Sequence, residues 1–174
     1  MSSLENLRVL VADDNQHMRA IVVAVLKSIG IRHLREAHDG AEALAVMRDW
    51  TVDLAIVDFR MEPIDGVEFT RLVRNSSDSK NPYLPIIMLT GYADRNRVFE
   101  ARDAGVTELV VKPVTAKAVI ARLQSVIFHP RPFVKTDHYF GPDRRRSGNI
   151  GYTGPERRGA ARAEEDARAD PAAN

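Results

Sequence analysis

Cysteine is absent from this 174-residue chain, which excludes disulfide bonds, thiolate nucleophiles and cysteine metal ligands. Long apolar runs are absent too, since the longest covers residues 20–26 and a bilayer span needs roughly 20 residues. Residues 1–6 carry no basic segment followed by an apolar core, so we predict neither a signal peptide nor a membrane span. The lack of cysteine fits a reducing compartment, and we expect a cytoplasmic location.

The chain also lacks a strong charge of either sign, because its formal net charge at pH 7 is only +1. Hydrophobic residues make up 44% of it, which is enough for a core and excludes a chain that is disordered throughout. The length allows one ordinary domain and some additional residues.

Five apolar strand patterns alternate with five amphipathic helix patterns between residues 7 and 128. We place the strands at residues 7–12, 34–37, 53–57, 86–89 and 107–111, and the helices end near residues 28, 49, 75, 104 and 128. Asn15 or Asp14 caps the first helix, and Ile21 belongs to its apolar face. The alternation predicts an α/β domain over residues 1–128, with a doubly wound five-stranded parallel sheet between two helical layers.

The composition changes after residue 128, where proline and glycine interrupt a stretch with almost no apolar periodicity. Two similar pieces, glycine-proline-acid-arginine-arginine, begin at Gly141 and Gly154. We predict that residues 129–174 form an arginine-rich, largely disordered tail. This tail has too few apolar residues for the core of a helix-turn-helix, so sequence-specific DNA binding is not expected.

Polar side chains follow the apolar residues where four of the predicted strands end. They are an acid pair, Asp13 and Asp14, then Asp58, Thr90 and Lys112. Because the ends of parallel strands meet at one edge of a sheet, we expect these five side chains to lie together. Asp58 alone also fits a residue that merely caps the next loop or helix, and its own stretch of sequence does not decide between the two.

Converging carboxylates repel one another, and a hard divalent cation such as Mg²⁺ relieves that repulsion. We predict that Asp14 and Asp58 bind Mg²⁺ directly, that Asp13 reaches it through water, and that the backbone carbonyl of Arg60 is a third ligand. The carboxylate of Asp58 is then shielded and able to attack a phosphorus atom.

The residues for the transferred group come from the last two strand ends. The amine of Lys112 and the hydroxyl of Thr90 are suited to hold phosphoryl oxygens, and Gly91 leaves room for them.

With these residues, the segment from 7 to about 128 resembles the receiver domain of two-component response regulators, most closely the stand-alone, CheY-like receivers. The resemblance implies a flavodoxin-like fold and a signalling protein that is not an enzyme beyond its own phosphorylation and dephosphorylation. It implies that a sensor histidine kinase or a phosphotransfer protein phosphorylates Asp58. Thr90 and Lys112 would then shift a face of the fourth helix and fifth strand that binds a downstream protein target.

The sequence departs from the family pattern at three places. The proline after the phosphoacceptor is displaced by one position in Met61-Glu62-Pro63, and the loop of residues 75–84 is long. The switch aromatic that precedes the lysine by three residues is replaced by Leu109, which has no hydrogen-bonding group. The aromatic readout of the family is therefore not expected here.

Other protein classes fit the strand ends less well. Haloacid-dehalogenase phosphatases need a second aspartate where this chain has Arg60, and a dinucleotide-binding domain needs a glycine-rich turn where it has Asp13 and Asp14. A receiver fold that is not regulated by phosphorylation stays open as an alternative, in which the chain is an effector that binds cyclic di-GMP or an acidic partner.

The tail arginines support several interpretations. Paired guanidinium groups match phosphates and guanine edges, so the tail weakly resembles the arginine-rich tails of CheY-like proteins that bind cyclic di-GMP. The candidate contacts are Arg144, Arg145, Arg146, Arg157 and Arg158. A solvated tail, docking to an acidic protein and non-specific RNA contact are the other interpretations, and the sequence does not separate them.

Overall fold

The structure is a computed structural model that describes residues 4–91 and 95–145. Its main sheet contains β1 (Arg8–Ala12), β2 (His33–Ala37), β3 (Leu54–Asp58), β4 (Ile86–Thr90) and β5 (Glu108–Val111). The helices between and after them are α1 (Gln16–Ser28), α2 (Gly40–Asp49), α3 (Gly66–Asn75), α4 (Arg95–Ala104) and α5 (Ala116–Phe128). All strand pairs are parallel in the order β2-β1-β3-β4-β5, which confirms the predicted doubly wound α/β fold.

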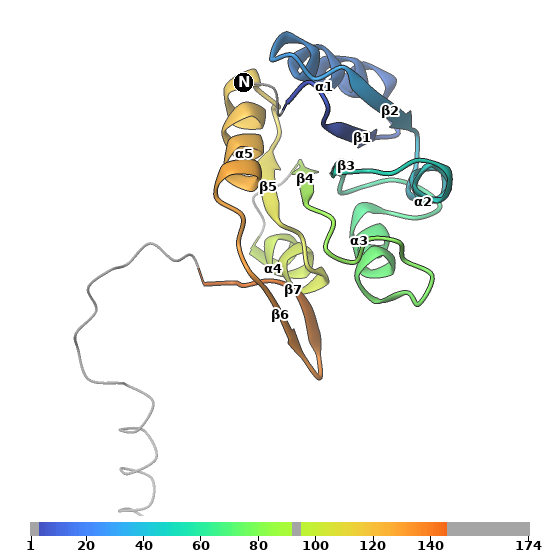
Figure 1. Cartoon of the computed structure of the whole chain (residues 1–174), viewed down its shortest axis with the longest axis vertical. Helices are drawn as coiled ribbons and strands as arrows, with labels where there is room; N and C mark the ends of the chain where they lie inside the picture. Colours follow the sequence, from blue (N-terminus) through green and yellow to red (C-terminus); the bar gives the residue numbers. More distant parts are fainter. Residues whose placement is uncertain (1–3, 92–94, 146–174) are drawn as a thin grey trace, which may run out of the picture. The chain divides into compact units, whose positions relative to one another are not determined.

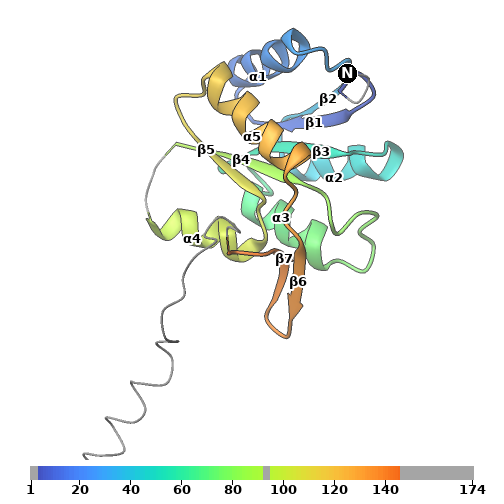
Figure 2. The same ribbon diagram turned by 60° about the vertical axis from the view of Figure 1, so that its left-hand side comes forward.

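Helices cover both faces of the sheet (Figures 1 and 2). On one face α1 and α5 contribute side chains such as Leu26 and Leu123 to a buried cluster. On the other face α2, α3 and α4 contribute Ala43, Phe69 and Ala101. Because every residue of the central strands β3 and β4 is buried, these strands read as continuous apolar runs in the sequence.

Short-range signals set the helix boundaries. The side chain of Asn15 accepts hydrogen bonds from the backbone N–H groups of His17 and Met18, so Asn15 rather than Asp14 caps α1. Past the end of that helix, Gly30 has a φ of 93°, a conformation that glycine adopts without steric cost. One prediction for α1 is wrong, because Ile21 is 46% exposed and lies off the buried face.

A hairpin follows α5 in a region where the sequence indicates no regular structure. Its antiparallel strands are β6 (Phe133–Thr136) and β7 (Tyr139–Pro142), and β7 contacts both α3 and α4. Residues Met1–Arg144 form one compact unit, so the folded part continues beyond residue 128. The expectation of a tail without regular structure from residue 129 onward therefore does not hold for residues 133–142.

Three aromatic rings explain why this short segment folds back. Phe133 and Phe140 of the hairpin pack with Tyr83, at centroid distances of 5.1 to 5.6 Å. The guanidinium of Arg74 lies 5.0 Å from the centroid of Phe133 and donates hydrogen bonds to the carbonyls of Gly105 and Pro82. These contacts join four distant parts of the chain, so no local periodicity of the sequence predicts the hairpin.

Within the part of the chain that the structure describes, no helix is both long and apolar enough to cross a membrane.

Candidate functional site

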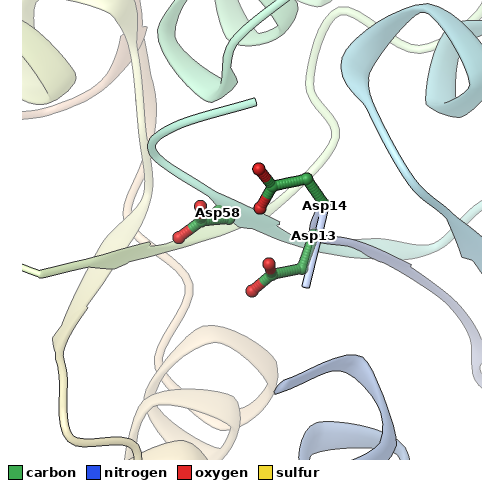
Figure 3. Close-up of side chains that lie close together, drawn as sticks. All are labelled: Asp13, Asp14 and Asp58. Atoms are coloured by element: carbon green, nitrogen blue, oxygen red, sulfur yellow. The ribbon is translucent and has the colours of Figure 1, made fainter. Parts of the chain in front are cut away.

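Three carboxylates meet where β1 and β3 end. Strand pairing sets Ala12 beside Val57, which brings Asp13 and Asp14 next to Asp58. Figure 3 shows the three side chains close together at the ends of the two strands, and one oxygen of each lies within 4.8 Å of the others. Asp13 and Asp58 are buried and Asp14 is exposed, so the cluster opens to solvent on one side.

Burial makes the charge on this cluster unfavourable. Burial is the main cause that raises the pKa of Asp13 to about 6, and the nearby charge of Asp58 acts in the same direction. The hydrogen bond from the backbone N–H of Asn15, 2.9 Å long, opposes the rise in this pKa. Burial also raises the pKa of Asp58, although contact with Lys112 acts against it.

Lys112 directly follows β5, and its amine reaches the acid cluster. Its Nζ lies 2.8 Å from Oδ1 of Asp58 and 3.8 Å from Oδ2 of Asp13. Burial lowers the pKa of this amine, but the hydrogen bond to Asp58 and the carboxylate charges outweigh burial and raise it. Lys112 therefore stays protonated, and it holds one oxygen of Asp58 in place.

The donor set fits a hard divalent cation. One lysine does not neutralise three ionised carboxylates, and the buried Oδ2 of Asp13 has no hydrogen-bond partner. An orphaned buried carboxylate oxygen is costly, and coordination to Mg²⁺ would satisfy it. The side chains in position to hold such an ion are Asp13, Asp14 and Asp58.

Glycines at the starts of α2 and α3 allow the backbone after β3 to approach these helices closely. A Cβ on Gly66 would lie 2.3 Å from the carbonyl oxygen of Asp58, and one on Gly40 would lie 2.6 Å from that of Ile64. The loop also returns to the acid, because the backbone N–H of Arg60 donates to Oδ2 of Asp58 over 3.2 Å. The predicted role of the Arg60 carbonyl as a metal ligand stays a prediction.

A cavity of about 90 Å³ adjoins the carboxylate of Asp58. Its lining consists of Asp58, Phe59, Arg60, Gly91, Arg97 and Lys112. The structure thus places Gly91 and Lys112 beside Asp58, with the buried Thr90 at the adjoining end of β4. No sequence pattern indicates Phe59 or Arg97 as site residues, since no periodicity relates a helix residue to a distant strand end.

Leu109 lies in β5 and packs, partly buried, against the core cluster of α2, α3 and α4. The side chain of Leu109 thus lies on the face of the sheet that α2, α3 and α4 cover.

The predicted tail contacts fall into two groups. Arg144 lies in the compact unit, where it pairs with Asp103 at 3.0 Å and stands 4.1 Å from the ring centroid of Tyr139. Arg145 is described and exposed. The remaining three, Arg146, Arg157 and Arg158, lie outside the described residues.

Comparisons with known proteins agree with this geometry. A family model described as response regulator receiver domain matches residues 9–124. The chain is 32% identical to the chemotaxis protein CheY-3 of Vibrio cholerae serotype O1, over 70% of its own length and 92% of that protein. It is also 32% identical to the chemotaxis protein CheY of Pseudomonas aeruginosa, over 69% of its own length and 95% of that protein.

Solved structures show the same fold. The structure of the chemotaxis response regulator CheY4 of Vibrio cholerae has a TM-score of 0.63 to this chain at 33% identity, and it aligns over 70% of this chain and 98% of its own. The receiver domain of the putative response regulator NarL from Mycobacterium tuberculosis aligns over 70% of this chain and 95% of its own, with a TM-score of 0.62 at 27% identity.

Proposed function

The chain belongs to the response regulator receiver family, and we propose that it accepts a phosphoryl group on Asp58 from a sensor histidine kinase or a phosphotransfer protein. The family is one of two-component signalling proteins rather than enzymes, and it implies the histidine kinase as a partner. The observation that carries the proposal is the site itself, in which Asp58 lies within the acid cluster and 2.8 Å from the amine of Lys112.

The reaction at Asp58 is a displacement at phosphorus. A carboxylate oxygen of Asp58 attacks the phosphorus of a phosphohistidine, an oxygen–phosphorus bond forms, and the nitrogen–phosphorus bond breaks. The electron pair of the broken bond stays on the imidazole nitrogen of the donor, and the ring leaves neutral because its other nitrogen carries a proton. The contact with Lys112 supports this step, because it opposes the rise in the pKa of Asp58 and fixes one of its oxygens.

Asp13, Asp14 and Asp58 would hold Mg²⁺. When bound, that ion neutralises the negative charge that gathers on the phosphoryl oxygens. The exposed Asp14 would bind the ion directly together with Asp58, and the buried Asp13 would reach it through water.

Thr90 and Lys112 read the new group. The phosphoryl group carries about 1.5 to 2 negative charges and replaces the single charge of the Asp58 carboxylate next to Lys112, so the amine and the hydroxyl of Thr90 move toward it. Thr90 ends β4, which leads into α4, and Lys112 directly follows β5, which comes after α4. The resulting shift of α4 and β5 changes the surface that binds a downstream protein target.

A direct test uses acetyl phosphate with Mg²⁺ and intact-mass measurement. We expect one added phosphoryl group on the wild type and none on Asp58→Asn. The matched control is Asp53→Asn. Asp53 lies just before the same strand, but it forms an ion pair with Arg8 and does not belong to the acid cluster. Persistent labelling of Asp58→Asn at another residue would contradict the assignment.

Binding of cyclic di-GMP gains no support from the described residues, since Arg144 is already paired with Asp103. The alternative function is tested by calorimetric titration of the full chain and of a chain that ends after Arg145 with cyclic di-GMP and its adenine analogue. A shorter truncation after Phe128 would remove the hairpin and part of the compact unit, so it is not a clean control. Binding that requires the tail and prefers guanine would favour the alternative.

A further inference from the structure

A second cation lies at the cavity beside Asp58, and it comes from a helix. Arg97 belongs to α4 and lines the 90 Å³ cavity together with Asp58 and Lys112. Its side chain is partly buried, unlike those of the preceding Arg95 and Asn96. The phosphoryl group of the proposed function would occupy this space, so the next inference rests on that function.

Phe59 holds the guanidinium of Arg97 at the cavity. The central carbon of that guanidinium lies 5.1 Å from the ring centroid of Phe59, within the range of a cation–π contact. The ring is itself fixed, because Phe59 is 8% exposed and its backbone bonds to both Leu89 and Gly66. Since Phe59 directly follows Asp58, the platform under Arg97 is built next to the phosphoacceptor.

We propose that Arg97 binds an oxygen of the phosphoryl group on Asp58, and that this contact transmits phosphorylation to α4. A planar guanidinium donates two parallel hydrogen bonds to a phosphate, which suits it to a group with several equivalent oxygens. Lys112 holds the group from β5 while Arg97 holds it from α4. Arg97 reaches the cavity from its border, since it also lines the neighbouring cavity of about 770 Å³ with Asp14 and Glu62.

The identity of Leu109 gives this contact its importance. A leucine has neither an aromatic ring nor a hydroxyl that could hydrogen-bond when Thr90 moves, so a hydrogen-bonded aromatic switch is not available in this chain. Arg97 offers another connection between the phosphoryl group and the same helix, made by charge rather than by the rotation of a ring. The connection is short, because the phosphoryl-binding residue is part of the element that moves.

The closest competing explanation is that Arg97 only covers the ring of Phe59. Arg102 on the same helix supplies the control for that role, because its guanidinium lies 4.7 Å from the ring centroid of Phe99 and it lines neither cavity. Substitutions at residues 97 and 102 therefore remove the same kind of ring contact from the same helix. Only the first also removes a cation from the site.

The experiment measures the Kd of beryllium fluoride, an analogue of a phosphoryl group, in the presence of Mg²⁺. We expect Arg97→Gln to weaken binding at least about tenfold, the loss of a charge-assisted hydrogen bond, and Arg97→Lys to weaken it less. Arg102→Gln should stay within about twofold of the wild type. Thermal unfolding of each variant verifies the fold, and Phe59→Leu, which withdraws the platform but keeps the charge, should weaken binding in the same direction as Arg97→Gln.

Amide NMR separates binding from transmission. On addition of beryllium fluoride, the wild type should show shifts along α4, and Arg97→Gln should lose most of them while the shift at Lys112 persists. Equal Kd values for Arg97→Gln and Arg102→Gln, or unchanged α4 shifts in Arg97→Gln, would overturn the role of Arg97. Failure of the wild type to bind beryllium fluoride, or binding by Asp58→Asn, would instead contradict the proposed function.

Discussion

The two ends of the parallel strands treat buried charge in opposite ways. At the carboxyl end, one lysine faces three acids, and a buried oxygen of Asp13 is left without a hydrogen bond. At the amino end, the buried guanidinium of Arg74 uses Nε and both terminal nitrogens as donors to backbone carbonyls. The first arrangement is incomplete without a ligand, and the second is complete within the chain.

This contrast teaches how to distinguish a binding site from a structural contact when both contain buried charges. The acid cluster has an unsatisfied buried atom and an opening to solvent, so an added ion or phosphoryl group lowers its free energy. Arg74 has neither, and the Phe133 ring of the hairpin covers it. The same physical cost of burial therefore favours ligand binding at one end and rigidity at the other.

The largest effect should come from breaking the complete end. Burial lowers the pKa of Arg74 to about 10, which still leaves its guanidinium charged at neutral pH. Arg74→Ala leaves the carbonyls of Gly105 and Pro82 without their donors and removes the contact with Phe133, so we expect a loss of about 3 to 5 kcal/mol of unfolding free energy. Denaturant titration measures this loss. The exposed Arg71→Ala on the same helix is the control, with an expected change below about 0.5 kcal/mol.

The incomplete end should respond in the opposite direction. Because burial raises the pKa of Asp13 from 3.8 to about 6, its ionisation costs stability, and the protein without Mg²⁺ should lose stability as the pH rises from about 4 to 6. Asp13→Asn should remove that loss and stabilise the metal-free protein at pH 7 by about 1 to 3 kcal/mol. It should also abolish most of the stabilisation by Mg²⁺ in thermal unfolding. A destabilised Asp13→Asn protein would show that the cluster is not strained.

The smallest effect should come from the ion pair of Arg8 and Asp53, which shares the amino end with Arg74. Burial acts to raise the pKa of Asp53, but hydrogen bonds from Arg8 outweigh it and lower that pKa, so the pair stabilises the fold above pH 4 and loses this effect as the pH falls further. Both side chains are about one third or more exposed, at 41% and 34%, so Asp53→Asn should cost only about 1 kcal/mol at pH 7. At pH 2 the variant and the wild type should unfold alike. A pH-independent difference would mean that packing rather than charge holds this corner.

Local patterns in the sequence were sufficient for the elements that position the site. The apolar runs that end in Asp58 and Thr90 are β3 and β4, and the cap at Asn15 starts α1. Parallel pairing then brings Asp13, Asp14 and Asp58 together because strand ends of one sheet lie level. A rule of topology is enough for this step, since the residues concerned directly follow buried strands.

What the sequence by itself determined is thus the fold of the domain and the acid cluster, both of which depend on neighbours along the chain and on the handedness and pairing of strands. Only the tertiary structure decided that Ile21 is exposed, that residues 133–142 form a hairpin on α3 and α4, and that Arg97 stands on Phe59 beside Asp58. Each of these depends on which distant surfaces meet. The burial and the contacts of a side chain depend on how distant segments pack together, and no periodicity of 2 or 3.6 residues in the sequence encodes that packing.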